Sequence, residues 1–370
     1  MNIPFLDLKA QYRSIKESID TAIADCVENT AFVQGARVAA FEREFAGFLG
    51  VGHCVGCANG TDALYLALRA LGVGPGDEVV LPANTFIATS EAVSLAGATP
   101  VMADVDPVSN NMGVAQAEAK LSPRTKALLP VHLYGLPADL EGLGRLATDK
   151  GLLLVADAAQ AHGAKIGGRD AAQLAPVTCY SFFPGKNLGA YGDAGGVATD
   201  DPALAERVAM LRNHGRKDKY LHQFEGLNMR MDEIQGAVLR AKLPHLAAWT
   251  QGRRRVAEAY RQALAGLGDL ALPPEIPGYE AVYHLFVVET ARRDALAAHL
   301  KAHGVATGVH YPVPLPLQPA YAHLNMGPGD IPVAAAKAGR ILSLPMFPEM
   351  TAEQVGYVRE AIAGFFAGRA

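Results

Sequence analysis

Residues 179–196 read CYSFFPGKNLGAYGDAGG, and this stretch points most directly to the fold and chemistry of the chain. A β-type run ends at Phe183, a Pro-Gly-Lys turn follows, and a glycine-rich segment comes next. A lysine just after an interior strand is unusual, because burying an ammonium group is costly. Lys186 therefore has two interpretations: an exposed loop lysine, or an amine that forms an imine with a carbonyl group.

The Gly-Lys pair also resembles the end of a Walker A phosphate loop, but its neighbours do not fit that motif. Tyr180 stands where the first glycine belongs, and Asn187 stands where Ser or Thr would bind magnesium. The segment therefore predicts no nucleotide-binding P-loop.

Over the first two-thirds of the chain, short apolar runs alternate with helical patterns. This alternation favours an α/β fold with a mostly parallel sheet covered on both faces. The predicted strands are Glu78–Leu81, Pro100–Ala103, Ala127–Val131, Leu152–Ala156, Thr178–Phe182 and Gly196–Thr199. The predicted helices between them include Asp62–Leu71, Ile87–Leu95 and Leu140–Lys150.

After about Met231 the pattern changes, which predicts a large domain over residues 1–248 and a smaller C-terminal α/β domain over 249–370. A long helical region reaches about Leu267, with an interruption expected near Trp249. The remainder is expected to contain the strands VYHLFVVET (282–290) and GVATGVHYP (304–312), a helix at Arg293–Ala302, and two helices near residues 334 and 352.

Three further segments supply groups that complement a reactive lysine. Asp157 ends an apolar strand 29 residues before Lys186, at the strand end where parallel sheets collect ligands. Gly60 and Thr61 open a helix, whose N-terminal amides form an anion site. Phe86 follows a strand and a polar turn, where a planar ring could stack on it.

Each of these segments also has an ordinary structural interpretation, as a helix cap or a core residue. Together they provide a phosphate site, a stacking ring, a carboxylate for a pyridine nitrogen and a lysine. This combination predicts a pyridoxal phosphate (PLP) enzyme, because the carboxylate keeps the pyridine nitrogen protonated and the ring then accepts electrons.

Composition excludes several other classes of protein. The 370 residues carry a net charge of −4 with 19% charged residues, so no basic surface for nucleic acid or anionic membrane is expected. No signal-peptide core or membrane-spanning run is present, which predicts a cytosolic protein. Cys54 and Cys57 form a C-x-x-C without a second ligand pair, so buried free thiols are expected and no metal site.

The segments NGTDAL, PANTFIAT, VHLYG, DAAQAHGA, SFFPGKNLGAYGDAGG, GLNMRMDEIQGAVL and HYPVPLPLQPAY resemble the DegT/DnrJ/EryC1/StrS family of sugar aminotransferases, in order along the chain. The resemblance implies the fold-type I (aspartate aminotransferase-like) architecture and a homodimer with shared active sites. It also implies transfer of an amino group from L-glutamate to a keto group of a nucleotide-linked sugar.

The resemblance also implies a role for individual residues. Lys186 is the Schiff-base lysine and general base, and Asp157 is the partner of the pyridine nitrogen. The other implied cofactor contacts are Gln160 at the phenolic oxygen, Phe86 on the ring, Gly60, Thr61 and Ser181 at the phosphate, and Asn228 from the second subunit.

The resemblance implies a 3-keto sugar as the substrate and three residues that contact it. PGKNLGAYGDAGG is similar to enzymes that act at C3, whereas members acting at C4 tend to carry a TGEGG-like segment. His310 and Tyr311 match a His-Tyr pair that approaches the sugar, and Lys219 of the neighbouring subunit is the third residue. Strand-end packing is the structural alternative for His310 and Tyr311.

The favoured substrate is a dTDP-linked 3-keto-6-deoxyhexose. A UDP-linked 3-keto sugar is an alternative, because Phe183 stands where several dTDP-sugar relatives have Tyr. Action of the same fold at C4 of a nucleotide-linked 4-keto sugar is a further alternative. Two other activities are considered. A sugar 3-dehydratase would have histidine in place of Lys186, and a non-catalytic PLP-binding regulator would usually add a DNA-binding module.

Overall fold

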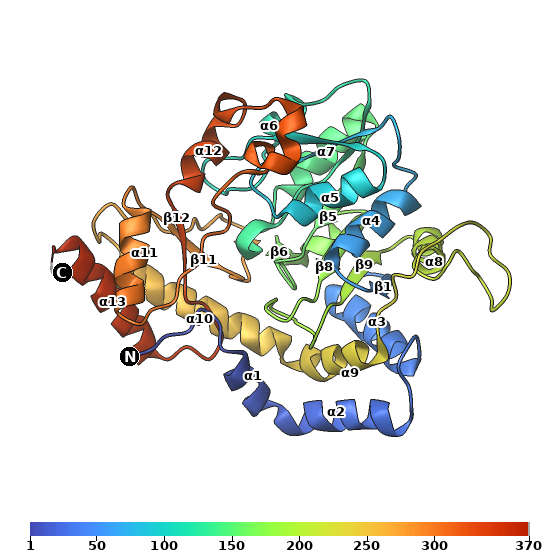
Figure 1. Cartoon of the computed structure of the whole chain (residues 1–370), viewed down its shortest axis with the longest axis horizontal. Coiled ribbons are helices and arrows are strands. Elements are labelled where there is room, and N and C mark those ends of the chain that lie inside the picture. Colours follow the sequence, from blue (N-terminus) through green and yellow to red (C-terminus); the bar gives the residue numbers. More distant parts are fainter. Residues whose placement is uncertain (369–370) are drawn as a thin grey trace.

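The computed structural model describes residues 1–368 and is built on a seven-stranded sheet (Figure 1). The strand order is β1-β9-β8-β5-β4-β2-β3, and β9 alone runs antiparallel to its neighbours in this sheet. The strands are β1 (His53–Cys57), β2 (Glu78–Pro82), β3 (Thr99–Ala103), β4 (Thr125–Leu128), β5 (Leu153–Asp157), β8 (Val177–Ser181) and β9 (Gly195–Thr199). The predicted mostly parallel sheet is confirmed.

Helices cover both faces of this sheet, as the alternating pattern predicted. One face packs against α4 (Gly60–Ala70), α5 (Ile87–Leu95) and α8 (Pro202–Leu211). The other face packs against α3 (Ala36–Leu49), α6 (Val114–Glu118), α7 (Leu140–Lys150) and α9 (Glu233–Lys242).

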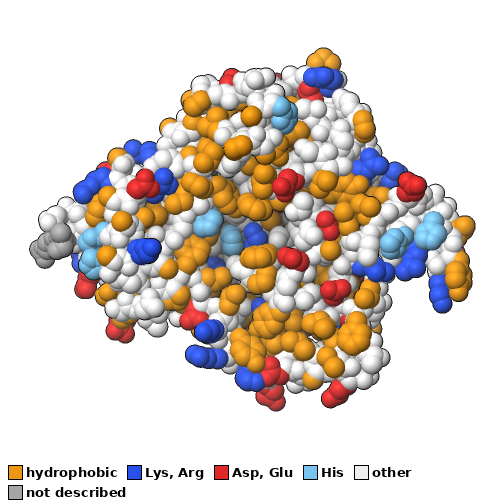
Figure 2. Space-filling view, viewed as in Figure 1, with side chains coloured by type: hydrophobic (Ala, Val, Ile, Leu, Met, Phe, Trp, Pro, Cys, Tyr) orange, Lys and Arg blue, Asp and Glu red, His pale blue; other side chains and the backbone are white. Residues whose placement is uncertain are grey.

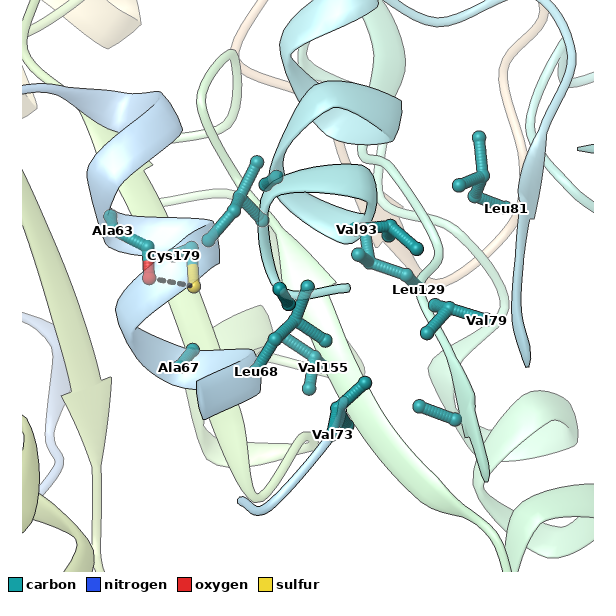
Figure 3. Packing of buried hydrophobic residues seen from close by; sticks show 14 of the residues in the cluster. Ala63, Ala67, Leu68, Val73, Val79, Leu81, Val93, Leu129, Val155 and Cys179 are labelled. Atoms are coloured by element: carbon teal, nitrogen blue, oxygen red, sulfur yellow. Dashed lines mark hydrogen bonds between the residues drawn. The ribbon is translucent and has the colours of Figure 1, made fainter. Parts of the chain in front are cut away.

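Neighbouring residues of the central strands face opposite layers of the core. In β5, Val155 joins the cluster beneath α4 and α5, while Leu154 and Ala156 join the cluster beneath α7. Figure 3 shows the first cluster, where Cys179 of β8 donates its S–H to the carbonyl oxygen of Ala63 at 3.4 Å. Each large apolar side chain buried here contributes about 1.5–3 kcal/mol, so the strand ends that carry the site rest on a rigid base.

The N-terminal and C-terminal segments form the rest of the molecule. The helices are α1 (Leu8–Ser14), α2 (Lys16–Glu28), α10 (Leu246–Leu264), α11 (Arg293–Ala302), α12 (Pro332–Ala338) and α13 (Ala352–Phe366). β11 (Phe286–Glu289) pairs with β12 (Ile341–Leu344), and β6 (Lys165–Ile166), β7 (Arg169–Asp170) and β10 (Tyr279–Glu280) form a small three-stranded sheet. Short 3-10 turns lie at 133–135, 171–173, 243–245, 315–317, 319–324 and 328–330.

Two predicted features of the C-terminal part are wrong. Residues 304–312 form no strand and make only single bridges, because Ile341–Leu344 takes the pairing position beside β11. The interruption of the long helical region lies at Leu243–His245 rather than at Trp249, which is inside α10. Pro244 explains the position, because proline lacks the N–H that an interior helical turn requires.

The division into residues 1–248 and 249–370 stays a prediction, and the hydrophobic core shows contacts across it. Ile3 belongs to the cluster formed by α10, α11, α13, β11 and β12. Leu315, Tyr321 and Ile331 instead pack in the cluster beneath α4 and α5. Each predicted domain therefore takes some of its core from the other end of the chain.

Two further findings concern the residues that the structure describes. No helix among residues 1–368 combines the length and apolar character needed to cross a membrane. All four cysteines are buried and free, as expected, and no group of His, Cys, Asp and Glu side chains in the described part is arranged to hold a metal.

Candidate functional site

The predicted cofactor residues of this chain, apart from Asn228, lie at the ends of β5 and β8 or on the segments that follow β1, β2, β5 and β8. Gly60 begins α4 after β1, Phe86 precedes α5 after β2, and Lys186 follows β8. Asp157 is the last residue of β5. Figure 2 shows a hollow near the centre of this face, with histidine and basic side chains inside it. The fold thus gathers residues that lie far apart in the sequence.

Asp157, which is buried, and Lys186, which is half-buried, are the two charged groups at the centre of the site. Burial lowers the pKa of the Lys186 amine to about 8, and the charge of Asp157 opposes this shift. Burial also raises the pKa of Asp157, and the charge of Lys186 opposes that shift in turn. An amine with a pKa of about 8 has a substantial neutral fraction near pH 7.5, which is the form that attacks a carbonyl group.

The Asp157 carboxylate is held by two hydrogen bonds. The Thr89 hydroxyl donates to one oxygen at 2.9 Å, and the backbone N–H of Ala159 donates to the other at 3.0 Å. The Thr85 hydroxyl lies 2.9 Å from the Thr89 hydroxyl and extends this network. Asp157 is therefore fixed in direction while it remains a carboxylate that can bind a protonated ring nitrogen.

The start of α4 lies directly against the end of β8. A Cβ atom on Gly60 would lie only 2.6 Å from the Cβ of Ser181, so no larger residue fits at this position. The Asn59 side chain caps the helix by accepting the Asp62 N–H at 2.8 Å. Glycine thus lets the helix N-terminus approach the Ser181 hydroxyl, an arrangement suited to an anion such as phosphate.

A series of polar and aromatic contacts connects the other predicted residues of the site. Gln160 donates from its amide to the Tyr311 hydroxyl at 3.3 Å and accepts the Tyr134 N–H at 2.6 Å. The Tyr134 hydroxyl donates to the His310 carbonyl oxygen. The rings of Phe86 and Tyr311 are 5.6 Å apart between centroids. The predicted residues Phe86, Gln160, His310 and Tyr311 are therefore brought together.

The sequence did not identify Tyr134 as a site residue. Its backbone has a φ of +61°, a conformation rarely adopted by residues other than glycine, and such local strain often marks functional positions. The only signal was its place in VHLYG, one of the segments that resemble the family.

Two predicted residues are not brought to Lys186 within the chain. Lys219 and Asn228 are both exposed and lie in the long connection between α8 and α9. The Lys219 amine lies over the ring of its neighbour Tyr220, 5.4 Å from the centroid, and Asn228 makes a single bridge to Asn213. Their predicted roles require a second subunit, as was expected for both.

The residues that the chain does assemble fit one kind of cofactor. They offer an anion site at Gly60, Thr61 and Ser181, a carboxylate for a ring nitrogen, an exposed aromatic face at Phe86 and a reactive amine. Phe86 is 53% exposed, so its ring is free to cover a planar ligand. A phosphorylated pyridine ring with a carbonyl group matches this set of donors and acceptors.

Comparison with known proteins gives one family across most of the chain. The model of the DegT/DnrJ/EryC1/StrS aminotransferase family matches residues 13–363. The crystal structure of S. venezuelae DesV, in complex with a ketimine intermediate, is similar with a TM-score of 0.96 and 46% identity, covering 99% of this chain and 98% of that one.

Three relatives of known name are similar over nearly their whole length. The UDP-N-acetyl-3-dehydro-alpha-D-glucosamine 3-aminotransferase of Acidithiobacillus ferrooxidans is 48% identical over 97% of both chains. The dTDP-3-amino-3,4,6-trideoxy-alpha-D-glucose transaminase of Streptomyces venezuelae is 47% identical over 97% of this chain and 95% of its own. A pleiotropic regulatory protein of Geobacillus stearothermophilus is 46% identical over 99% of both chains.

Proposed function

This chain belongs to the DegT/DnrJ/EryC1/StrS aminotransferase family, and we propose that it moves an amino group onto C3 of a nucleotide-linked keto sugar with pyridoxal phosphate as cofactor. L-Glutamate is the proposed amino donor. The observation that carries the proposal is the pairing of the buried Asp157, held by Thr89 and Ala159, with the half-buried Lys186, close enough that the charge of each shifts the pKa of the other.

Bound pyridoxal phosphate supplies an electron-accepting ring on which a Cα–H bond is weakened. Asp157 holds the ring nitrogen in its protonated form, and Thr89 and Ala159 keep that carboxylate aimed. Lys186 anchors the cofactor through its amine and then moves a proton to and from the substrate carbon. Because burial lowers its pKa to about 8, this amine takes up and releases protons near physiological pH.

The remaining residues bind and orient. Gly60, Thr61 and Ser181 bind the phosphate, and Gln160 faces the phenolic oxygen of the ring. Phe86 covers the outer face of the ring with its exposed side chain. Asn228 completes the phosphate site from the second subunit of a homodimer.

Transfer of the amino group to C3 of the sugar is supported by the positions of Tyr311 and His310 and by the names of two relatives. Tyr311 and His310 lie beside Phe86 and Gln160, where a sugar ring entering above the cofactor would meet them. Two relatives at 47–48% identity carry 3-amino or 3-dehydro sugars in their names. Lys219 from the second subunit is proposed as the third sugar contact.

The nucleotide is proposed to be dTDP, with a 3-keto-6-deoxyhexose as the sugar. A UDP-linked 3-keto sugar is the second candidate, because the relative at 48% identity is named for a UDP-linked substrate. A regulatory role is the candidate of a different class, because another relative is named as a regulatory protein. Lys186 and Asp157 favour catalysis, since a regulator has no need of a lysine whose pKa is lowered into the range of proton transfer.

The test is incubation of the purified protein, loaded with pyridoxal phosphate, with glutamate and one keto sugar at a time. The sugars are dTDP-linked 3-keto-6-deoxyglucose, UDP-linked 3-keto-N-acetylglucosamine and dTDP-linked 4-keto-6-deoxyglucose, and mass spectrometry detects the amino sugar. We expect turnover of a 3-keto sugar. Turnover of the 4-keto sugar alone would rule out attack at C3, and no turnover of any sugar would favour the regulatory role.

A further inference from the structure

Asn187, the residue after Lys186, is buried and makes two hydrogen bonds to a segment almost a hundred residues away. Its side-chain amide donates to the carbonyl oxygen of Val282 at 2.9 Å. Its Oδ1 atom lies 3.2 Å from the Nδ1 atom of His284. Only 3% of Asn187 is exposed, so water cannot replace these partners. The position of Asn187, and with it the backbone of Lys186, is set by residues 282–284.

The two contacts also fix the tautomer of His284. The Val282 carbonyl can only accept a hydrogen bond, so the NH₂ group of Asn187 must face it. The Oδ1 atom of Asn187 therefore faces His284 and can only accept. It follows that Nδ1 of His284 carries the proton and Nε2 carries the lone pair.

The electrostatic surroundings keep His284 in this neutral form. Burial lowers the pKa of His284 well below its ordinary value, and the positive charges of Lys186 and Arg253 lower it further. The nearby rings of His162 and His310 act in the same direction. In this neutral form Nδ1–H is the donor to Asn187, and Nε2 remains an acceptor across the physiological pH range.

The segment that carries His284 is itself held from two further sides. Val282 donates its N–H to the Gly135 carbonyl at 2.9 Å, and Leu285 donates to the Tyr134 carbonyl at 3.2 Å. The buried Arg253 side chain donates to the carbonyls of Tyr283 and His284 at 3.0 and 3.3 Å. The same short segment thus touches the lysine loop on one side and the Tyr134–Gln160 contacts on the other.

We propose that His284 is a positioning residue for Lys186, acting through the hydrogen bond that its Nδ1–H donates to Asn187. The inference rests on the proposed function of Lys186 as the cofactor lysine. In this arrangement His284 neither transfers the proton of the reaction nor contacts the substrate. It holds the loop so that the amine of Lys186 stays near Asp157, and it links this loop to the segment that contacts Tyr134.

The test compares two substitutions of His284 that differ in one hydrogen bond. His284→Asn keeps an N–H donor close to the position of Nδ1, whereas His284→Phe fills the space without a donor. Asn187→Ala removes the acceptor, and the double variant Asn187→Ala/His284→Phe closes a thermodynamic cycle. Thermal melting of each protein establishes that it is folded, and Asn187→Ala carries the test if His284→Phe is not.

Two quantities are measured for every variant. The first is the pKa of the Lys186 amine in cofactor-free protein, obtained by competitive labelling with acetic anhydride and mass spectrometry. The second is kcat with the substrate identified above. In His284→Phe and Asn187→Ala we expect the pKa of Lys186 to rise toward that of an exposed lysine, and kcat to fall about 10- to 100-fold, as misplacement of a catalytic group does. His284→Asn should remain within about threefold of the wild type.

The outcomes separate this inference from the proposed function. If the wild-type chain binds pyridoxal phosphate at Lys186 but His284→Phe leaves both quantities unchanged, the positioning role is wrong. If His284→Asn is as impaired as His284→Phe, the ring itself matters and the hydrogen bond to Asn187 does not. Additive losses in the double variant would also contradict it, since two residues acting through one bond lose it once. If the wild type does not bind the cofactor, the proposed function fails first.

Discussion

The loop around Lys186 and the connection between α8 and α9 are proposed to serve one reaction, but the chain holds them differently. In the lysine loop, the N–H of Lys186 bonds to the Phe183 carbonyl at 2.9 Å and Ala190 bonds to Phe182 at 2.7 Å. In the other region, Tyr220 is 80% exposed. Figure 1 shows this connection extending away from the sheet beyond α8.

Both regions contain local hydrogen bonds, so local order is not what separates them. Asp218 accepts the backbone N–H groups of Tyr220 and Leu221 at 2.9 and 2.8 Å, which shapes the tip of the connection. The difference lies in packing, because Asn187 and Leu188 of the lysine loop are buried whereas the tip rests on no core cluster. One chain therefore supplies most of the proposed cofactor site, and the proposed second chain would supply Asn228 and Lys219.

The largest effect is expected from removing the central group of the buried region. Lys186→Ala should lose the visible absorbance of bound pyridoxal phosphate and lower kcat at least about 10³-fold, because anchor and proton carrier disappear together. Absorbance spectra and steady-state rates check this, with the exposed Lys301→Ala as control. A variant that kept both the absorbance and the turnover would remove the basis of the comparison.

The same burial should make the cofactor-free protein sensitive to pH. The pKa of Lys186 falls from an ordinary 10.5 to about 8 on folding, so the folded chain binds this proton less tightly than the unfolded chain. Stability should therefore rise as the pH increases from about 8 to 10.5, and Lys186→Met should be more stable at pH 7 by up to about 3 kcal/mol. Urea unfolding at pH 7 and pH 10 measures both proteins, and an unchanged difference between them would show that Lys186 is not desolvated.

In the exposed region, a smaller and more selective effect is expected. Lys219→Ala should raise KM for the nucleotide sugar about tenfold, as loss of a charge-assisted hydrogen bond does, and leave the cofactor absorbance unchanged. Lys217→Ala is the matched control, because Lys217 pairs with Glu206 of its own chain at 2.6 Å. Equal kinetics of the two variants would argue against a substrate contact from Lys219.

Mixing subunits sharpens this prediction further. Dimers that combine one Lys186→Ala subunit with one Lys219→Ala subunit should regain activity, because one of the two sites then has both lysines intact. Absence of recovery in mixed dimers identified by mass spectrometry would place both lysines in the same chain's site.

The smallest effect is expected where the buried region meets the sugar. Tyr311→Phe removes the hydroxyl that accepts from Gln160 at 3.3 Å, so kcat/KM should fall about fivefold, corresponding to about 1 kcal/mol. Tyr321→Phe breaks a buried hydrogen bond to Ser90 at 2.6 Å elsewhere in the fold and should leave kcat/KM unchanged. A similar loss in both variants would indicate a general effect on stability.

Much of the sheet could be predicted from the sequence, because apolar strands and amphipathic helices carry their own periodicity. The strands that hold Asp157 and Lys186 were placed to within a residue or two. Residues 304–312 show where this fails. Their alternating pattern suits a strand, but the choice of which segment pairs with β11 depends on packing between distant parts of the chain, and Ile341–Leu344 makes that pairing.

The candidate site divides in the same manner. Lys186, Asp157, Gly60 and Phe86 could be proposed from the sequence, because each is a residue type suited to a cofactor and each lies at the end of a strand or shortly after one. Tyr134 and His284 could not, because their importance lies in the groups they touch. The local sequence indicates neither the left-handed backbone conformation of Tyr134 nor the hydrogen bond of His284 to Asn187.

By itself, the sequence determined the α/β fold and the residues proposed to carry the chemistry, since residue type and the alternation of strands and helices can be seen in the local pattern. Only the tertiary structure decided how Lys186 is held. Its neighbour Asn187 forms hydrogen bonds with Val282 and His284, which lie almost a hundred residues away in the sequence. A hydrogen bond between buried groups requires both partners to be placed by packing. The sequence alone places a lysine at position 186, whereas the lowering of its pKa depends on the fold.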